Sequence, residues 1–186
     1  MSYFHLTCKL FYIRHHHPVP LLSEEQIRDY RLKVDLSELG LPVKEFSLED
    51  LKAMPKHEVV VTLQCSGNRR GGYNEIKRTS GTSWYQGAIS TAKWGGVKLR
   101  DVLEAAGLKE GVAIEKGLEH VRFQSIDGLK ASIDLAKAMS LYGDCLVAYE
   151  MNGEDLPRDH GFPVSICLNH SAKFFHVALP YLQIER

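Results

Sequence analysis

The sequence predicts a single domain with an α+β fold, and three observations point to it. The chain has 186 residues, of which 44% are hydrophobic, and this is enough for one packed core and little more. Segments with the hydrophobic period of strands and of helices are mixed along the chain, without the regular alternation of a doubly wound parallel sheet. No repeat or low-complexity linker divides the chain. We therefore expect one globular unit built on a mixed sheet.

Three elements are expected in the first third of the chain. Residues 30–36 alternate apolar and polar side chains, which predicts a half-buried strand. Residues 47–55, SLEDLKAMP, predict a short helix with Ser47 as its N-cap and Pro55 at its end. Residues 57–64, HEVVVTLQ, predict a buried strand that leads directly to a cysteine.

Further elements are expected in the second half. Residues 97–108, VKLRDVLEAAGL, carry apolar side chains at helical spacing and a glycine suited to end the helix. Residues 120–127, HVRFQSID, predict a strand, and Ser132 is expected to cap a short helix through IDLAKAM. Asn152 and Gly153 predict a type I′ hairpin turn, because both residue types tolerate positive φ.

Charge and hydropathy exclude several kinds of partner. Lys plus Arg and Asp plus Glu both number 23, so no overall field attracts the chain to nucleic acid or to a membrane surface. No run of roughly 18 apolar residues is present. The first residues, MSYFHLTCKLFYIR, resemble neither a secretory signal nor a transit peptide. We expect no nucleic-acid partner, no membrane partner and no visible targeting peptide.

Cys65 is the cysteine whose neighbourhood suggests chemistry. The four cysteines form no C-x-x-C pair, so each is judged singly. Cys65 ends an apolar strand and precedes SGNRRGG, in which Gly67 permits a sharp turn and two arginines supply positive charge. The six residues CSGNRR alone favour core packing over a metal-ligating thiolate, although nearby cations favour the anion that a soft metal binds. A phosphatase-type nucleophile is disfavoured, because that signature needs arginine at position 71, where this chain has glycine.

Four separated segments change that ranking. FYIRHHHPVP, TLQCSGNRR, GAISTAKWGGVKLRDVL and AYEMNGEDLPRDHGFPV follow one another over residues 11–164. Together they resemble the molybdopterin-binding domain of sulfite oxidase. The resemblance implies the mixed-sheet molybdopterin-binding oxidoreductase fold of that family, incomplete at its C-terminal end. Residues 1–164 would form a partial molybdopterin-binding domain, and residues 165–186 a divergent tail that is not a separate domain.

The resemblance also implies the site. In that family, the cysteine of the motif that matches CSGNRR is the only protein ligand of molybdenum. Cys65 would therefore bind the metal, and Arg14 would help to bind an anionic substrate, so both would be catalytic. The residues that would contact the cofactor are Tyr12, Ile13, Arg14, His15, His16, Arg70, Asp127 and His160.

Two positions depart from the family, and several have structural interpretations. The family usually has asparagine at the position of His15 and often an apolar residue at that of His17. The three histidines could instead form a polar loop or a weak adventitious metal site. Arg70 also fits a surface charge, Asp127 a turn and His160 a core histidine.

The implied activity is oxidation of sulfite to sulfate by oxygen-atom transfer at a molybdenum–molybdopterin cofactor, with a haem protein or oxygen as electron acceptor. Neither a haem domain nor the dimerisation domain of the homodimeric family is expected in this chain. Resemblance to animal members implies the mitochondrial intermembrane space.

Two other interpretations remain open at this stage. One is the homologous molybdenum domain of nitrate reductase, which shares the cysteine motif. The other is a catalytically inactive, truncated isoform that acts only as a binding fragment. The family's arginine after the HGFPV segment is replaced here by Ser165, and its later lysine and tyrosine have no counterpart, so catalysis by this chain is uncertain.

Overall fold

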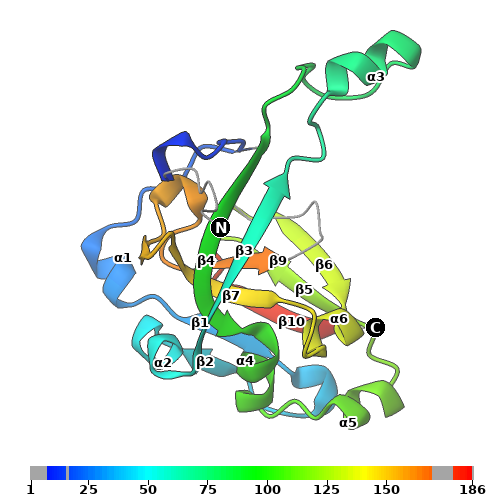
Figure 1. The fold of residues 1–186 in the computed structure, drawn as a ribbon. Coiled ribbons are helices and arrows are strands. Elements are labelled where there is room, and N and C mark those ends of the chain that lie inside the picture. Colours follow the sequence, from blue (N-terminus) through cyan, green and yellow to red (C-terminus); the bar gives the residue numbers. More distant parts are fainter. Residues whose placement is uncertain (1–7, 16, 169–177, 186) are drawn as a thin grey trace.

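The structure is a computed structural model that describes residues 8–15, 17–168 and 178–185. Within these residues the chain forms two five-stranded sheets with short helices at their edges and ends (Figure 1). Sheet A has the strand order β2-β1-β10-β5-β6. Sheet B has the order β3-β4-β7-β8, with β9 paired to β7. Parallel and antiparallel pairs both occur, so the predicted α+β fold with a mixed sheet is confirmed.

Apart from the longer strands β3 and β4, the helices and strands of the described residues are short, and they do not alternate regularly along the chain. They are η1 (Cys8–Leu10), α1 (Glu24–Arg28), β1 (Leu32–Asp35), η2 (Ser37–Leu39), β2 (Lys44–Phe46), α2 (Leu48–Ala53), β3 (Lys56–Gln64), α3 (Arg70–Ile76), β4 (Ile89–Lys98), α4 (Leu99–Ala105), α5 (Glu110–Glu115), β5 (His120–Gln124), β6 (Lys130–Asp134), α6 (Leu135–Met139), β7 (Cys145–Met151), β8 (Glu154–Asp155), η3 (Arg158–His160), β9 (Ser165–Leu168) and β10 (Tyr181–Glu185).

Sheet A brings the C-terminal strand to its centre. Strand β10 pairs in parallel with β1 and antiparallel with β5. Two tyrosines reinforce the join between the start and the end of the chain. The hydroxyl of Tyr30 donates to the carbonyl of Leu179, and the hydroxyl of Tyr181 donates to Oδ2 of Asp35 over 2.5 Å. Burial and then Asp35 raise the pKa of Tyr181 to about 12, so this hydroxyl keeps its proton at neutral pH.

The described C-terminal residues, 165–168 and 178–185, each contain a strand. Strand β9 pairs with β7 in sheet B, and β10 lies within sheet A. Residues 165–168 are all buried. The predicted division of the chain at residue 164 concerns resemblance to a family and stays a prediction.

Sheet B contains a long ribbon that carries the cysteine segment. Strands β3 and β4 pair over nine residues, from Lys56 opposite Val97 to Gln64 opposite Ile89. Beyond the ribbon the chain forms helix α3, which stands away from the body of the molecule (Figure 1). Cys65 directly follows β3 and therefore lies at the end of the ribbon, where the chain begins to run out toward α3.

Most local predictions are confirmed. Residues 32–35 form a strand whose apolar side chains are buried, and Leu99–Ala105 form the expected helix. Gly107 follows this helix with a φ of 105°, as a terminating glycine should. Asn152 and Gly153 have φ values of 55° and 87°, as the predicted hairpin turn requires.

Three local predictions were wrong in part. Strand β3 is not buried throughout, because its side chains alternate between a packed face and an exposed face that carries Lys56, Glu58 and Thr62. The strand predicted for residues 120–127 ends at Gln124, since a turn closed by hydrogen bonds between Ser125 and Leu129 follows. Ser132 does not cap a helix. It lies in β6, where backbone pairing holds it extended, and α6 begins only after Asp134.

The predicted cap of helix α2 is confirmed and gives a first testable expectation. Ser47 accepts from the backbone N–H of Asp50, and Asp50 accepts from that of Ser47. We expect Ser47→Ala to lower the free energy of unfolding by about 1 kcal/mol, because one backbone donor of the first turn loses its acceptor. Urea unfolding measures this change. Ser80→Ala, at an exposed bend outside the helices and strands, is the control and should change stability far less.

Two apolar clusters fill the interior. The larger one joins sheet A to helices α4 and α6 and to one face of β7 and β9. The smaller one covers the other side of sheet B around Trp94 and includes Phe11 from the N-terminal segment. Phe11 thereby fixes the start of the segment that contains Tyr12 and Arg14.

Among the described residues, no helix has both the length and the apolar character needed to span a membrane.

Candidate functional site

Of the three cysteines whose side chains the structure describes, Cys65, Cys145 and Cys167, the accessible thiol is that of Cys65. It is half-buried, whereas Cys145 and Cys167 are buried. Burial raises the pKa of both buried thiols, which keeps them protonated. Cys65 follows the last residue of β3, and its backbone N–H donates to the carbonyl of Ala88 over 2.9 Å. The backbone N–H of Gly67 points back toward the sulfur, at 3.4 Å.

Two arginines meet on one indole ring beside the cysteine loop. The guanidinium carbon of Arg14 lies 4.9 Å from the centre of the Trp84 ring, and that of Arg70 lies 5.5 Å from it. Arg70 also donates to the carbonyl of Thr82 over 3.3 Å. Contacts of this kind between a cation and an aromatic face restrict a long flexible side chain. The ring of Trp84 thus gathers two positive charges that are 56 positions apart in sequence.

Gly67 allows this arrangement to form close to the thiol. A Cβ atom at Gly67 would lie 2.9 Å from Nη2 of Arg70 and 2.9 Å from Cζ2 of Trp84. Any side chain at this position would push both groups away. The glycine of the CSGNRR motif is therefore needed for the approach of Arg70 and Trp84 to the loop, as well as for its turn.

The N-terminal segment runs past the end of the β3–β4 ribbon. The backbone N–H of Tyr12 donates to Oγ of Ser90 over 3.1 Å, and the Tyr12 ring stacks on Phe11 at 5.3 Å. Burial raises the pKa of the Tyr12 hydroxyl, and the nearby Cys65 raises it further. The electrostatic contact places Tyr12 close to the thiol. Arg14 donates to the carbonyl of His15.

Asp127 lies in the turn between β5 and β6, where three donors surround its carboxylate. Oδ1 accepts from Oγ of Ser125 and from the backbone N–H of Leu129, and Oδ2 lies 3.2 Å from Nδ1 of His17. Burial alone would raise the pKa of Asp127, but these hydrogen bonds outweigh it, so the pKa lies below its ordinary value. The carboxylate is therefore ionised at neutral pH.

His15 links the N-terminal segment to two acidic residues. Burial lowers the pKa of His15, and Arg14 lowers it further, while Asp159 and Asp127 act in the opposite direction. His15, Asp127 and Asp159 are thus close enough to interact electrostatically, although they come from three distant parts of the chain. His160 is fully buried, and its ring packs edge-on against Phe11 at 5.2 Å.

The structure brings most of the predicted site residues to one region. The cysteine loop holds Cys65, and Arg14 and Arg70 lie beside it. The N-terminal segment links this loop to four further residues, which are Tyr12, His15, Asp127 and His160. Ile13 lies between Tyr12 and Arg14 and is 55% exposed. His16 lies outside the described residues. The roles assigned to all of these residues stay predictions.

Sequence reasoning missed Trp84 and the contact of His17. Trp84 lies three positions before the segment GAISTAKWGGVKLRDVL, and nothing in its local sequence indicates that the arginines converge on it. Its Nε1 donor is buried and has no hydrogen-bond partner among the described residues. A buried donor without a protein partner is completed by a water, an ion or a ligand.

These groups fit a molybdenum–pterin cofactor. Thiolate is a soft ligand suited to such a metal, and Cys65 is exposed enough to reach one. Among the described residues, no three His, Cys, Asp or Glu side chains lie close enough to hold a metal ion by themselves. A metal at Cys65 would therefore need donors from its own cofactor. Arginines and an unpaired indole N–H suit the anionic parts of such a group.

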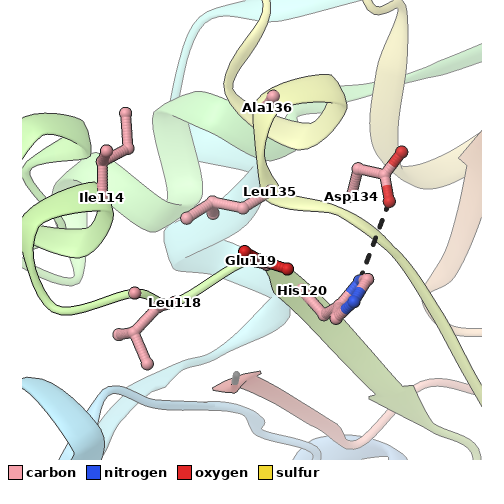
Figure 2. A pocket seen from close by; sticks show the side chains of 8 residues that line it. Ile114, Leu118, Glu119, His120, Asp134, Leu135 and Ala136 are labelled. Carbon is pink, nitrogen blue, oxygen red and sulfur yellow. Dashed lines mark ion pairs between the residues drawn. The ribbon is translucent and has the colours of Figure 1, made fainter.

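A separate cavity lies elsewhere and includes none of these residues. It has a volume of about 370 Å³ and lies at the start of β5, whereas Asp127 follows the end of that strand. Ile114, Leu118 and Leu135 contribute apolar surface, and Glu119, His120 and Asp134 contribute polar groups (Figure 2). The cavity is therefore distinct from the cysteine site.

Comparisons with known proteins agree with this arrangement. The chain is 47% identical to mitochondrial sulfite oxidase of Rattus norvegicus over 168 residues, which cover 84% of this chain and 28% of that protein. It is 32% identical to the NADPH nitrate reductase of Aspergillus niger over 167 residues, covering 84% of this chain and 18% of the reductase. The chain thus spans less than a third of either relative, and the sulfite oxidase is the more similar.

A solved structure shares the fold. The sulfane dehydrogenase SoxCD of Paracoccus pantotrophus superimposes with a TM-score of 0.74 at 23% identity, covering all of this chain and 44% of that one. A family model, the oxidoreductase molybdopterin-binding domain, matches residues 16–176. That match includes Cys65, Arg70, Trp84, Asp127 and His160. On this evidence, the chain belongs to the oxidoreductase molybdopterin-binding domain family.

Proposed function

We propose that the chain binds a molybdenum–molybdopterin cofactor through Cys65 and supports oxidation of sulfite to sulfate. The observation that carries this proposal is the convergence of Arg14 and Arg70 on Trp84 beside the Cys65 loop. Similarity to sulfite oxidases over most of the chain supports the same substrate. When bound, the cofactor supplies the oxygen-atom transfer and the two-electron redox chemistry.

In this proposal, the side chains of the protein bind the cofactor and orient the anionic substrate. Cys65 holds the metal of the cofactor. Arg14 and Arg70 attract a small dianion and offset its charge, and planar guanidinium groups suit the oxygen atoms of such an anion. Trp84 keeps the two guanidinium groups together despite their mutual repulsion, and its Nε1 supplies a further donor. Asp127 contacts the pterin part of the cofactor, and His160 contacts its pyrophosphate end.

We propose the electron acceptor and the cellular location from the similarity to known relatives. A haem protein or oxygen accepts the electrons. The names of the animal relatives support a mitochondrial location, and we propose the intermembrane space. Dimerisation through a further domain, as in the family, is not assigned to the described residues.

Substrate assays test the proposal. The chain is produced with a source of molybdenum cofactor, and sulfite-dependent reduction of ferricyanide is compared with nitrate-dependent oxidation of a reduced viologen dye. We expect turnover of sulfite and none of nitrate. Arg14→Gln should lower kcat/KM for sulfite by about 100-fold, because a charged donor aimed at the anion is lost. Arg28→Gln, on the exposed helix α1, is the control and should leave activity unchanged.

The outcomes separate the alternatives. Turnover of nitrate in place of sulfite would assign the chain to the nitrate-reductase type. A chain that is loaded with cofactor but inactive toward both anions would instead be a binding fragment.

A further inference from the structure

His17 and Asp127 meet across 110 positions of sequence. Nδ1 of His17 lies 3.2 Å from Oδ2 of Asp127. The contact joins the N-terminal segment to the turn between β5 and β6. Both segments carry residues that the proposed function assigns to the cofactor. The contact itself is a property of this chain, since His17 stands where the resemblance led us to expect an apolar residue.

Hydrogen bonding leaves the carboxylate of Asp127 in one orientation. Ser125 and Leu129 both donate to Oδ1, and His17 is the described partner of Oδ2. An ionised carboxylate has about four acceptor positions. Three are used by described residues, so one is left on the Oδ2 side for a ligand. The hydrogen bond from His17 therefore sets the direction in which the free acceptor position of Oδ2 points.

The burial of the two side chains is unequal. Asp127 is 8% exposed, whereas His17 is 53% exposed. A carboxylate removed from water depends strongly on each donor it has, and an exposed histidine can hold its position without a large loss of hydration. His15 is a further titratable group near Asp127, and it also interacts electrostatically with Asp159 and Arg14. His17 bonds directly to the carboxylate.

A second histidine–aspartate pair provides a contrast. His120 and Asp134 face each other at the ends of β5 and β6, beside the separate cavity (Figure 2). Their closest atoms are 3.7 Å apart, and the side chains are 40% and 79% exposed. An exposed pair of this kind contributes little. It therefore serves as a matched control for the pair at Asp127.

We propose that His17 is a positioning residue that holds Asp127 in the orientation needed to accept hydrogen bonds from the N–H groups of a pterin ring. This inference rests on the proposed function and adds a determinant of cofactor affinity to it. His17 need not touch the cofactor, because it acts through the carboxylate. Its role depends on the hydrogen bond from Nδ1, so a side chain that retains a donor should replace it.

Cofactor content tests this inference without any measurement of activity. The wild-type chain and the variants His17→Leu, His17→Gln, Asp127→Asn and His120→Leu are produced with a cofactor source and dialysed. Bound pterin is released, oxidised to its fluorescent form and counted per chain. Thermal unfolding of each variant is measured in parallel.

We expect His17→Leu to lower the pterin content about tenfold, in line with the loss of one hydrogen bond to a charged group. Asp127→Asn should lower it at least as much. His17→Gln should restore most of it, and His120→Leu should equal the wild type. A merely structural role of His17 would instead lower thermal stability in both His17 variants and show no rescue by glutamine.

Each contrary result has a definite meaning. Normal pterin content in His17→Leu together with a loss in Asp127→Asn would overturn the role of His17 and leave the proposed function standing. Normal content in Asp127→Asn would remove Asp127 from the site and overturn the inference too. A wild-type chain that binds no pterin would overturn both the inference and the proposed function.

Discussion

Cys65→Ser is expected to reduce the molybdenum content of the chain on the order of a hundredfold when it is produced with a cofactor source. In the proposed site Cys65 is the single protein ligand, and a serine hydroxyl is a much harder and less acidic ligand than a thiol. Because Cys65 is half-buried at the end of an edge strand, the substitution should leave the fold intact. Metal per chain, measured by mass spectrometry, and an unfolding curve check both statements.

Cys145→Ser is the matched control for this experiment. The Cys145 thiol is 4% exposed and lies 3.4 Å from the carbonyl of Gly143, so a serine hydroxyl there can find an acceptor. It lies in the larger apolar cluster, away from the arginines. We expect wild-type molybdenum content in this variant. Equal metal content in Cys65→Ser and in the wild type would remove the assignment of Cys65 as ligand.

The elements that the sequence predicted correctly are those with local signals. The cap of α2 needs only Ser47 and Asp50, and the hairpin turn needs only Asn152 and Gly153. Each of these two patterns spans at most four consecutive residues, so the cap and the turn can be predicted without knowledge of any tertiary contact. Helix α1 has a similar capping box, in which Ser23 pairs with Gln26. That pattern was present in the sequence and was missed.

Elements defined by tertiary pairing could not be predicted in the same way. Strand β10 has five residues, and its place between β1 and β5 depends on partners more than 50 positions away. Ser132 is compatible with either a cap or a strand, and its pairing with Arg122 decided the outcome. The edge position of β3 also depends on the order of strands in the sheet, which the sequence of β3 does not contain.

In the candidate site too, local motifs could be predicted from the sequence and long-range contacts could not. Family resemblance directed attention to Cys65, Arg70 and Asp127, because each stands in a recognisable motif. Resemblance gave no information on how side chains meet. The convergence of two arginines on Trp84 and the contact of His17 with Asp127 are both long-range contacts, so only a three-dimensional structure reveals them.

Leu182→Ala is expected to lower the free energy of unfolding by about 3 kcal/mol. Leu182 is fully buried at the centre of sheet A, opposite Val34 on one side and Phe123 on the other. Truncation to alanine would leave a cavity between three strands that cannot close without shifting the sheet. Leu182→Asp should prevent folding altogether, because the cost of an unpaired buried carboxylate is comparable to the whole stability of a domain.

Gln183→Ala separates the effect of burial from that of the strand itself. Gln183 neighbours Leu182 in β10, but its side chain points to the opposite face and is only half-buried, so we expect a change within about 0.5 kcal/mol. Urea unfolding followed by circular dichroism measures all three variants. If Leu182→Ala and Gln183→Ala unfolded at the same urea concentration as the wild type, residues 178–185 would not belong to the core. In that case β1 and β5 would have to be held together without β10, and the fold of sheet A described above would be wrong.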